Sequence, residues 1–179
     1  MFSRQNALLL VIDMQERLLP QIHDSSPLVK NTLLLIECCK ILKVPVIVTE
    51  QYPEGIGPTV AALAPALDQC PRIAKRTFSC WREPQFMRAL KESGKKQVII
   101  VGIETHVCVF QTTADLIGEK YAVEIMADAV GARTAANNAI GLARMQALGA
   151  DISSAESCLF ELLETSACPE FKQVLRQIK

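Results

Sequence analysis

The stretch Val98-Ile-Ile-Val-Gly-Ile-Glu-Thr-His-Val-Cys108-Val-Phe-Gln-Thr-Thr113 decides the fold of this chain. Its first part is a continuous apolar run, the pattern of a strand that is buried on both faces. A helix is predicted to begin at Cys108, so the stretch reads as a strand, a turn and a helix. A thiol in the first turn of a helix lies near unpaired backbone N–H groups, which favour the thiolate. The sequence therefore predicts a lowered pKa for Cys108 and a nucleophilic sulfur.

The same alternation of strands and helices runs along the whole chain. Apolar runs predict strands at Leu8–Asp13, Val46–Thr49, Arg72–Lys75, Gln97–Gly102 and Ala122–Met126. Helical spacing predicts helices at Leu28–Leu42, Thr59–Leu67, Glu83–Ser93, Cys108–Glu119, Ala135–Leu148 and Phe171–Ile178, and Ser153-x-x-Glu156 predicts a capping box for one more. This order is typical of an α/β protein with a doubly wound, Rossmann-like, mostly parallel sheet and helices on both faces. We expect one domain over residues 1–179.

Composition excludes several classes of partner and site. Nineteen basic residues balance nineteen acidic ones, so neither nucleic acid nor an anionic membrane is an expected partner. The longest apolar stretch, Leu33–Val48, contains charges and a proline, so we expect no membrane span. The N-terminal run Ala7–Ile12 is cut short by Asp13 and no small-residue cleavage site follows, so we expect no signal peptide. Seven cysteines without a Cys-x-x-Cys pair, beside two histidines, favour reduced thiols in a cytoplasmic protein over a zinc cluster.

Polar residues stand where the predicted strands end. Asp13 ends the first strand, Glu50 and Gln51 end the second, Lys75 ends the third and Cys108 follows the fourth. In a parallel sheet these ends meet at one edge, where ligands bind. A carboxylate there can accept the thiol proton, and an ammonium can stabilise the resulting thiolate. The sequence therefore predicts a nucleophilic site made of these groups.

Each residue also has a purely structural explanation. An aspartate at a strand end commonly caps a turn, a lysine after a strand is commonly solvated, and a cysteine is commonly a small buried hydrophobe. The hypothesis of a catalytic site therefore depends on Asp13, Lys75 and Cys108 lying together.

The chain resembles the isochorismatase-like cysteine hydrolase family, in particular the branch of isochorismatase-domain-containing proteins. The resemblance is carried by four motifs in order: Val11-Ile-Asp-Met-Gln15, Thr49-Glu-Gln-Tyr-Pro53 with Gly57-Pro58 after it, Lys75-Arg-Thr-Phe-Ser79, and Gly102-Ile-Glu-Thr-His-Val-Cys108. It implies a catalytic triad of Asp13, Lys75 and Cys108. It also implies a cis peptide at Ile103–Glu104 and an oxyanion hole made by the backbone N–H groups of Glu104 and Cys108. Members of the family are commonly oligomers, so a homo-oligomer is expected.

Two departures from the family narrow the expected activity. Relatives that are nicotinamidases carry an Asp-x-His metal motif after the second strand, whereas this chain has Glu50-Gln-Tyr-Pro-Glu54 there. We therefore predict no metal and no other cofactor. True isochorismatases lack the cysteine, so the presence of Cys108 argues against isochorismate as substrate.

Other side chains near the predicted edge have less certain roles. Gln51, Tyr52, Phe78, Trp81 and His106 are candidates for the substrate pocket, although the aromatic ones are equally suited to a subunit contact. His106 is not expected to be the base, because residues two apart in a helical turn do not face one another. A further acid, in Ala127-Asp-Ala-Val130, is expected to hold a loop by hydrogen bonds to backbone groups.

These observations predict a metal-free cysteine hydrolase that acts on a small amide, carbamoyl or related C–N substrate through an acyl-enzyme on Cys108. One alternative is a catalytically silent scaffold or binding protein with the same fold. Another is a thiol redox sensor in which Cys80 resolves an oxidised Cys108.

Overall fold

The protein is built on one parallel sheet at its centre. The computed structural model describes residues 1–179 and contains six strands in the order β3-β2-β1-β4-β5-β6, each parallel to its neighbours. The predicted doubly wound α/β fold is confirmed. The strand order reverses between β1 and β4, which is where ligands bind in sheets of this kind. The strands are β1 (Ala7–Ile12), β2 (Val46–Gln51), β3 (Arg72–Lys75), β4 (Gln97–Ile103), β5 (Ala122–Gly131) and β6 (Asp151–Ser153).

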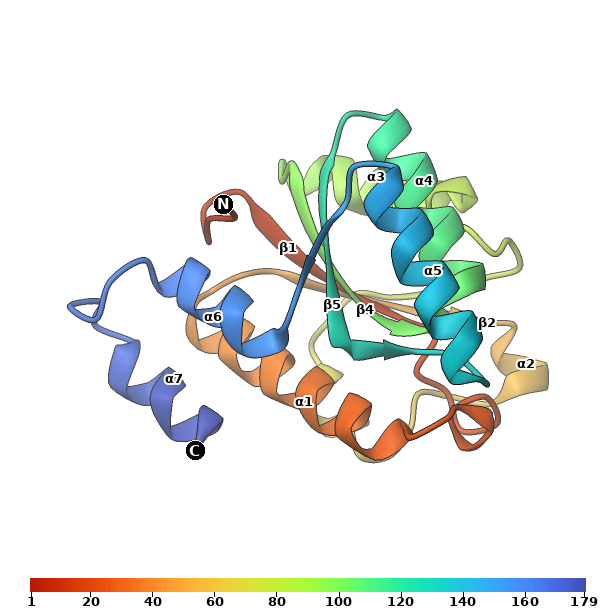
Figure 1. The fold of residues 1–179 in the computed structure, drawn as a ribbon, viewed down its shortest axis with the longest axis horizontal. Coiled ribbons are helices and arrows are strands. Elements are labelled where there is room, and N and C mark those ends of the chain that lie inside the picture. Colours follow the sequence, from red (N-terminus) through yellow and green to blue (C-terminus); the bar gives the residue numbers. More distant parts are fainter.

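Helices cover both faces of the sheet (Figure 1). One face is covered by α1 (Ser25–Ile41), α6 (Ala155–Leu163) and α7 (Phe171–Ile178), and the other by α3 (Pro84–Glu92), α4 (Phe110–Gly118) and α5 (Ala135–Ala147). The remaining short elements are η1 (Leu19–Gln21), α2 (Pro53–Ile56), η2 (Ala64–Leu67), η3 (Cys80–Arg82) and the single π-helical turn η4 (Thr105–Val109).

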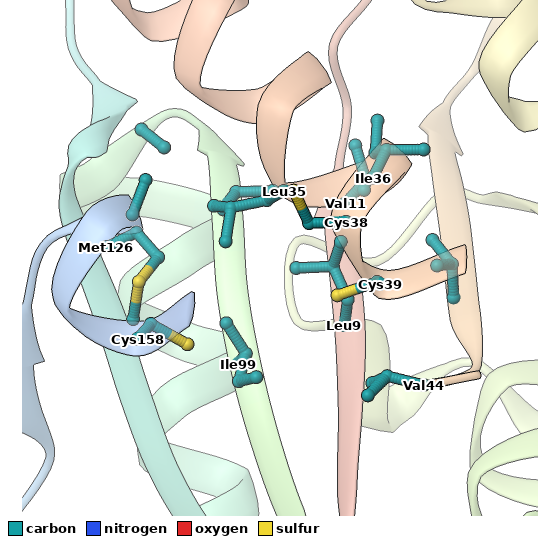
Figure 2. Packing of buried hydrophobic residues seen from close by; sticks show 14 of the residues in the cluster. Leu9, Val11, Leu35, Ile36, Cys38, Cys39, Val44, Ile99, Met126 and Cys158 are labelled. Carbon is teal, nitrogen blue, oxygen red and sulfur yellow. The ribbon is translucent and has the colours of Figure 1, made fainter. Parts of the chain in front are cut away.

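The continuous apolar strands follow from this two-sided cover. In β1, Leu9 and Val11 pack against α1, while Leu8, Leu10 and Ile12 face the opposite layer. Figure 2 shows the first of these layers, where Leu9 and Val11 lie beside side chains of α1. Because alternate residues of a strand point to opposite faces, a strand with two covered faces needs apolar residues throughout. No helix of the protein combines the length and the apolar character needed to cross a bilayer.

Several predicted boundaries need correction. The predicted helix Thr59–Leu67 is wrong, because only Ala64–Leu67 is helical, as a 3₁₀ turn that begins next to Pro65. Strand β5 extends to Gly131 rather than Met126, since after an irregularity in β4 its end pairs with Gly102 and Ile103. Strand β6 and the short helix α2 were not predicted.

The N-cap of α6 is Ser154 and not the predicted Ser153. The Ser154 hydroxyl accepts a hydrogen bond from the Ser157 N–H at 3.3 Å, whereas Ser153 ends β6. The predicted capping box therefore begins one residue too early, because the sequence alone did not show that a strand occupies the position before the cap.

Gly102 permits the close approach of β4 to β1. It lies opposite Ile12 in the register, its φ is +117°, and a Cβ atom at this position would overlap the Ile12 carbonyl oxygen. We expect Gly102→Ala to lower the free energy of unfolding by about 3 kcal/mol, since strain and overlap add. Denaturant unfolding measures this.

Gly118→Ala is the matched control. Gly118 ends α4, and apart from the adjacent residues and the backbone of its own helix no atom lies within 4 Å of the place that an alanine Cβ would take. Alanine there is expected to stabilise the protein by up to ~1 kcal/mol, because it favours the helix more than glycine does. Equal unfolding midpoints for Gly102→Ala and the wild type would contradict the close-approach argument.

A buried acid in β5 predicts a pH dependence of stability. The Glu124 carboxyl is buried and its Oε2 has no hydrogen-bond partner; burial first, and then the charge of Glu161, raise its pKa. The folded state therefore binds this proton more tightly than the unfolded state. The resulting stability is complete below the ordinary carboxyl range and is lost as the pH rises through the folded-state pKa.

We expect Glu124→Gln to be more stable than the wild type at about pH 8, with a difference that disappears toward about pH 4. Thermal unfolding across this range measures the difference. The exposed Glu119→Gln serves as control and is expected to show no such trend. A constant offset for Glu124→Gln at all pH values would refute the buried-proton explanation.

Candidate active site

Asp13 follows β1 and is completely buried. Its backbone has a positive φ of 51° and its N–H donates to the Thr49 carbonyl at 3.1 Å, which turns the side chain across the end of the sheet. Its Oδ1 accepts from the Thr49 hydroxyl at 2.8 Å and its Oδ2 accepts from Lys75 Nζ at 2.6 Å. Both oxygens are therefore fixed, and the carboxylate has one defined orientation.

Lys75 ends β3 and its side chain has no exposed surface. Besides Asp13, its ammonium donates to Gln51 Oε1 at 2.7 Å and to the carbonyls of Phe78 and Thr77 at 3.2 and 3.3 Å. Burial by itself lowers the pKa of Lys75, but the Asp13 charge and further contributions outweigh it, so the pKa lies above its ordinary value. Lys75 is therefore a cation that stays charged in a dry site.

Cys108 lies in the π-helical turn η4, ahead of α4, and is 7% exposed. The prediction of a lowered pKa is wrong. Burial raises the pKa of the Cys108 thiol well above its ordinary value, Asp13 raises it further through its charge and a hydrogen bond, and Lys75 only partly opposes them. The helix-end effect assumed from the sequence is smaller than the cost of burying a thiolate. At rest the sulfur is a protonated thiol beside a carboxylate that can accept its proton.

A second thiol lies close to the same cluster. Cys80 is completely buried, its Sγ is 3.8 Å from the Thr49 hydroxyl, and its N–H donates to Thr112 Oγ1, one turn beyond Cys108. Burial raises the pKa of Cys80 to about 11, although Lys75 opposes the shift. Peroxide reacts with thiolates, so two protonated thiols do not favour the redox alternative.

Two glutamines fix the strand ends around the lysine. The amide of Gln51 accepts from Lys75 through Oε1 and donates to the Arg76 carbonyl at 3.0 Å through Nε2. The buried Gln15 accepts from the Gln51 N–H at 2.7 Å and donates to the carbonyls of Gln51 and Gly57 at 2.9 and 2.6 Å. Gln51, predicted as a pocket residue, is thus committed to holding Lys75.

Thr49 and Gln15 are site residues that the sequence reasoning missed. Both stand inside the quoted motifs, Gln15 two residues after Asp13 and Thr49 just before Glu50. Their position inside these motifs was the sequence feature that could have marked them as site residues. Glu50 itself accepts from Thr59 and from Arg72 at 2.7 Å, so it holds the following loop and does not contact Asp13 or Lys75.

Two of the three predicted aromatic residues lie next to the cluster. The N–H of Tyr52 donates to the Lys75 carbonyl at 2.9 Å, and the Phe78 carbonyl accepts from Lys75 Nζ. Their side chains are 39% and 53% exposed. Trp81 is different: its ring packs edge-to-face on Tyr121 at 5.6 Å, within the layer formed by α3 and α4. A role for Trp81 in the pocket wall is not supported by these contacts.

The turn that carries Cys108 begins with Glu104, whose side chain is paired with Arg133. The Ile103–Glu104 peptide bond is cis, and the Glu104 carboxylate accepts from Arg133 Nε at 3.0 Å. His106 is half-buried, and its Nδ1 is buried without a hydrogen-bond partner. Farther along β5, the Asp128 carboxylate accepts from the Ala155 N–H at 2.9 Å, which confirms its predicted role in holding backbone.

No group of three or more His, Cys, Asp or Glu side chains is arranged to hold a metal ion. The polar cluster at the carboxyl ends of the central strands consists of the Cys108 thiol, the Asp13 carboxylate and the Lys75 ammonium. These three groups are suited to nucleophilic hydrolysis.

The comparisons with known proteins agree with this class. The family model for the isochorismatase domain matches residues 7–157. Isochorismatase domain-containing protein 2 of Danio rerio is 35% identical over 173 residues, which cover 96% of this chain and 86% of the relative. The chain belongs to the isochorismatase family and is a hydrolase of that family.

Three solved structures share the fold almost completely. MAR1 ribonuclease from Caenorhabditis elegans is 35% identical with a TM-score of 0.94, covering 99% of this chain and 91% of its own. YcaC from Pseudomonas aeruginosa, solved with hexane-2,5-diol and covalent acrylamide, is 30% identical with a TM-score of 0.92, covering 98% and 90%. The Escherichia coli YcaC protein, an octameric hydrolase of unknown specificity, is 26% identical with a TM-score of 0.88, covering 99% and 95%.

The buried pair predicts strongly non-additive effects of mutation. We expect Lys75→Met alone to lower the free energy of unfolding by about 3–5 kcal/mol, because it leaves the Asp13 charge buried and unpaired. The double variant Asp13→Asn/Lys75→Met removes both charges and is expected to recover most of this loss. Denaturant unfolding of the single and double variants measures the coupling. Additive losses would show that the two charges do not depend on one another.

Proposed function

We propose that this protein is a metal-free cysteine hydrolase that cleaves a small amide, carbamoyl or related C–N substrate through an acyl-enzyme on Cys108. The observation that supports it is the shared electrostatic environment of three buried groups. Asp13 is paired with Lys75, and the Cys108 thiol interacts with the charges of both.

In the first step, the Cys108 thiol gives its proton to Asp13 as the sulfur attacks the substrate carbonyl carbon. The carbonyl oxygen becomes an oxyanion, for which the backbone N–H groups of Glu104 and Cys108 are the proposed donors. The tetrahedral intermediate then collapses, the C–N bond breaks, and Asp13 returns the proton to the leaving nitrogen. An amine or ammonia leaves, and a thioester remains on the sulfur.

In the second step, a water molecule attacks the thioester. Asp13 accepts a proton from the water, and the oxyanion forms again at the same donors. Collapse breaks the C–S bond, and the sulfur recovers its proton from Asp13 as the acid product leaves. Lys75 keeps its own proton throughout and balances negative charge, whether that charge lies on Asp13 or on the sulfur.

The raised pKa of the thiol fits this sequence of events. A thiol that is protonated at rest does not react until a substrate displaces water and a base takes the proton. Asp13, which is held by Thr49 and Lys75, lies beside the sulfur in the role of that base. Covalent acrylamide in the P. aeruginosa YcaC structure supports small amides as ligands, because acrylamide is one.

Cleavage of RNA is the second candidate, since the structurally similar C. elegans protein is named a ribonuclease. The balanced composition does not favour this function. The remaining alternative, a silent scaffold, would have no chemical need for a thiol, a carboxylate and an ammonium buried together.

A screen of small amides for ammonia release tests the proposal. We expect Cys108→Ala to lower turnover of any substrate found by at least about a thousandfold, because the nucleophile is lost. Asp13→Asn is expected to be similarly impaired, whereas Cys70→Ala, which alters a partly exposed thiol far from the cluster, is expected to keep wild-type turnover. Unchanged hydrolysis by Cys108→Ala would end the proposal, and Cys108-dependent cleavage of RNA would favour the second candidate.

A further inference from the structure

We infer that the substrate of this site is electrically neutral: a small uncharged amide or carbamoyl compound, and not an anion such as a carboxylate or a phosphodiester. The inference rests on the proposed function and narrows its substrate class. It comes from the state of the cations at the catalytic edge. Those that touch the triad or the nucleophile turn are already neutralised by carboxylates of the protein itself.

Lys75 is the cation closest to the reacting sulfur, and it has no donor left for a substrate. Its ammonium makes short hydrogen bonds to Asp13 and Gln51, and the remaining N–H is shared between two backbone carbonyls. Its side chain has no exposed surface. An anionic substrate could reach this charge only by displacing Asp13, which the proposed reaction needs as its base.

Arg133 is the cation that contacts the nucleophile turn. Its Nε donates to Glu104 Oε2 at 3.0 Å, and its backbone N–H donates to the same oxygen at 3.3 Å. The Glu104 carboxylate thus cancels the guanidinium charge four residues before Cys108. The pair is neutral as a whole, and the carboxylate would repel a second anion.

Of the other arginines around the strand ends, two are paired with carboxylates at short distance, and two are exposed and make weaker or uncharged contacts. Arg72 pairs with Glu50 at 2.7 Å and Arg82 pairs with Asp115 at 2.8 Å. Arg76 lies over the Tyr52 ring at 3.5 Å, with Glu54 at 3.8 Å. Arg17, which is exposed, donates to the carbonyl of Gly55. None of these contacts involves Asp13, Lys75 or Cys108.

An anion entering this site would lose its water without gaining a partner. Burying an unpaired charge is costly, whereas a neutral amide loses only hydrogen bonds that backbone groups can replace. The same reasoning disfavours isochorismate, which carries two carboxylates, and the phosphodiester backbone of RNA.

The test compares two reagents that differ only in charge. Iodoacetamide is neutral and iodoacetate is anionic; in each case the sulfur displaces iodide, a C–S bond forms, a C–I bond breaks and the thiol proton is released. Labelling of Cys108 is followed by mass spectrometry of its peptide at about pH 8.5, near the ordinary pKa of a cysteine thiol. Free cysteine under the same conditions gives the intrinsic ratio of the two rates.

We expect the iodoacetamide-to-iodoacetate ratio at Cys108 to exceed that of free cysteine by at least about tenfold. Glu104→Gln frees Arg133 and is expected to bring the ratio back toward that of free cysteine. The matched control Asp115→Asn frees Arg82, away from the nucleophile turn, and is expected to leave the ratio as in the wild type.

A wild-type ratio equal to or below that of free cysteine would overturn the inference, because it would mean that the site accepts an anion. An unchanged ratio in Glu104→Gln would overturn the role given to the Arg133–Glu104 pair. The hydrolysis assay distinguishes a failure of the neutral-substrate inference from a failure of the proposed function. If Cys108→Ala is inactive but the ratio is not raised, or neither reagent labels Cys108, only the neutral-substrate inference fails; if Cys108→Ala stays active, the proposed function fails as well.

Discussion

The buried pair between Lys75 and Asp13 is the interaction on which the site depends. Two opposite charges with no exposed surface lie 2.6 Å apart, and each is held by further hydrogen bonds. Such a pair is costly to desolvate and contributes little to stability by itself. Its value is geometric, because the pair can exist in only one arrangement without leaving a charge unsatisfied. The ends of β1 and β3, far apart in the chain, are thereby fixed against each other.

The sheet explains why this pair can form beside a thiol. Strand β1 lies at the centre, where the strand order reverses, with β2 and β3 on one side and β4 on the other. Lys75 reaches Asp13 across the end of β2, and the turn after β4 brings Cys108 to the same carboxylate from the opposite side. Gly102 permits this approach because it has no side chain to collide with Ile12.

The sequence predicted most helices and strands and the end of the sheet at which the polar residues meet. It did not predict the pKa of the buried thiol. The bounds of β3 and α7 match the predicted ones, because a short apolar pattern and an amphipathic pattern are local signals. Strand β5 was cut short because Asp128 interrupts its apolar run, and because its end pairs with β4 only after a shift in register. The pKa of Cys108 was predicted in the wrong direction, since the depth of burial depends on how all layers pack. Thr49 and Gln15 were missed for a related reason: a threonine or glutamine in a strand motif has no chemical signature until its partners are known.

The protonated state of the Cys108 thiol and the lack of a free cation at the site have the same cause, which is the complete pairing of Lys75. Because Lys75 is fully engaged by Asp13, Gln51 and backbone carbonyls, its charge supports a thiolate only weakly, and burial keeps the sulfur protonated at rest. The same engagement leaves no free positive charge to attract an anion. At rest the site contains a neutral thiol and an ion pair whose charges cancel, so its net charge is zero. A neutral substrate that enters leaves this net charge unchanged, and no additional charge has to be buried. In the proposed mechanism the proton that moves from Cys108 to Asp13 stays within the cluster, which limits the electrostatic cost of forming the thiolate to the moment of attack.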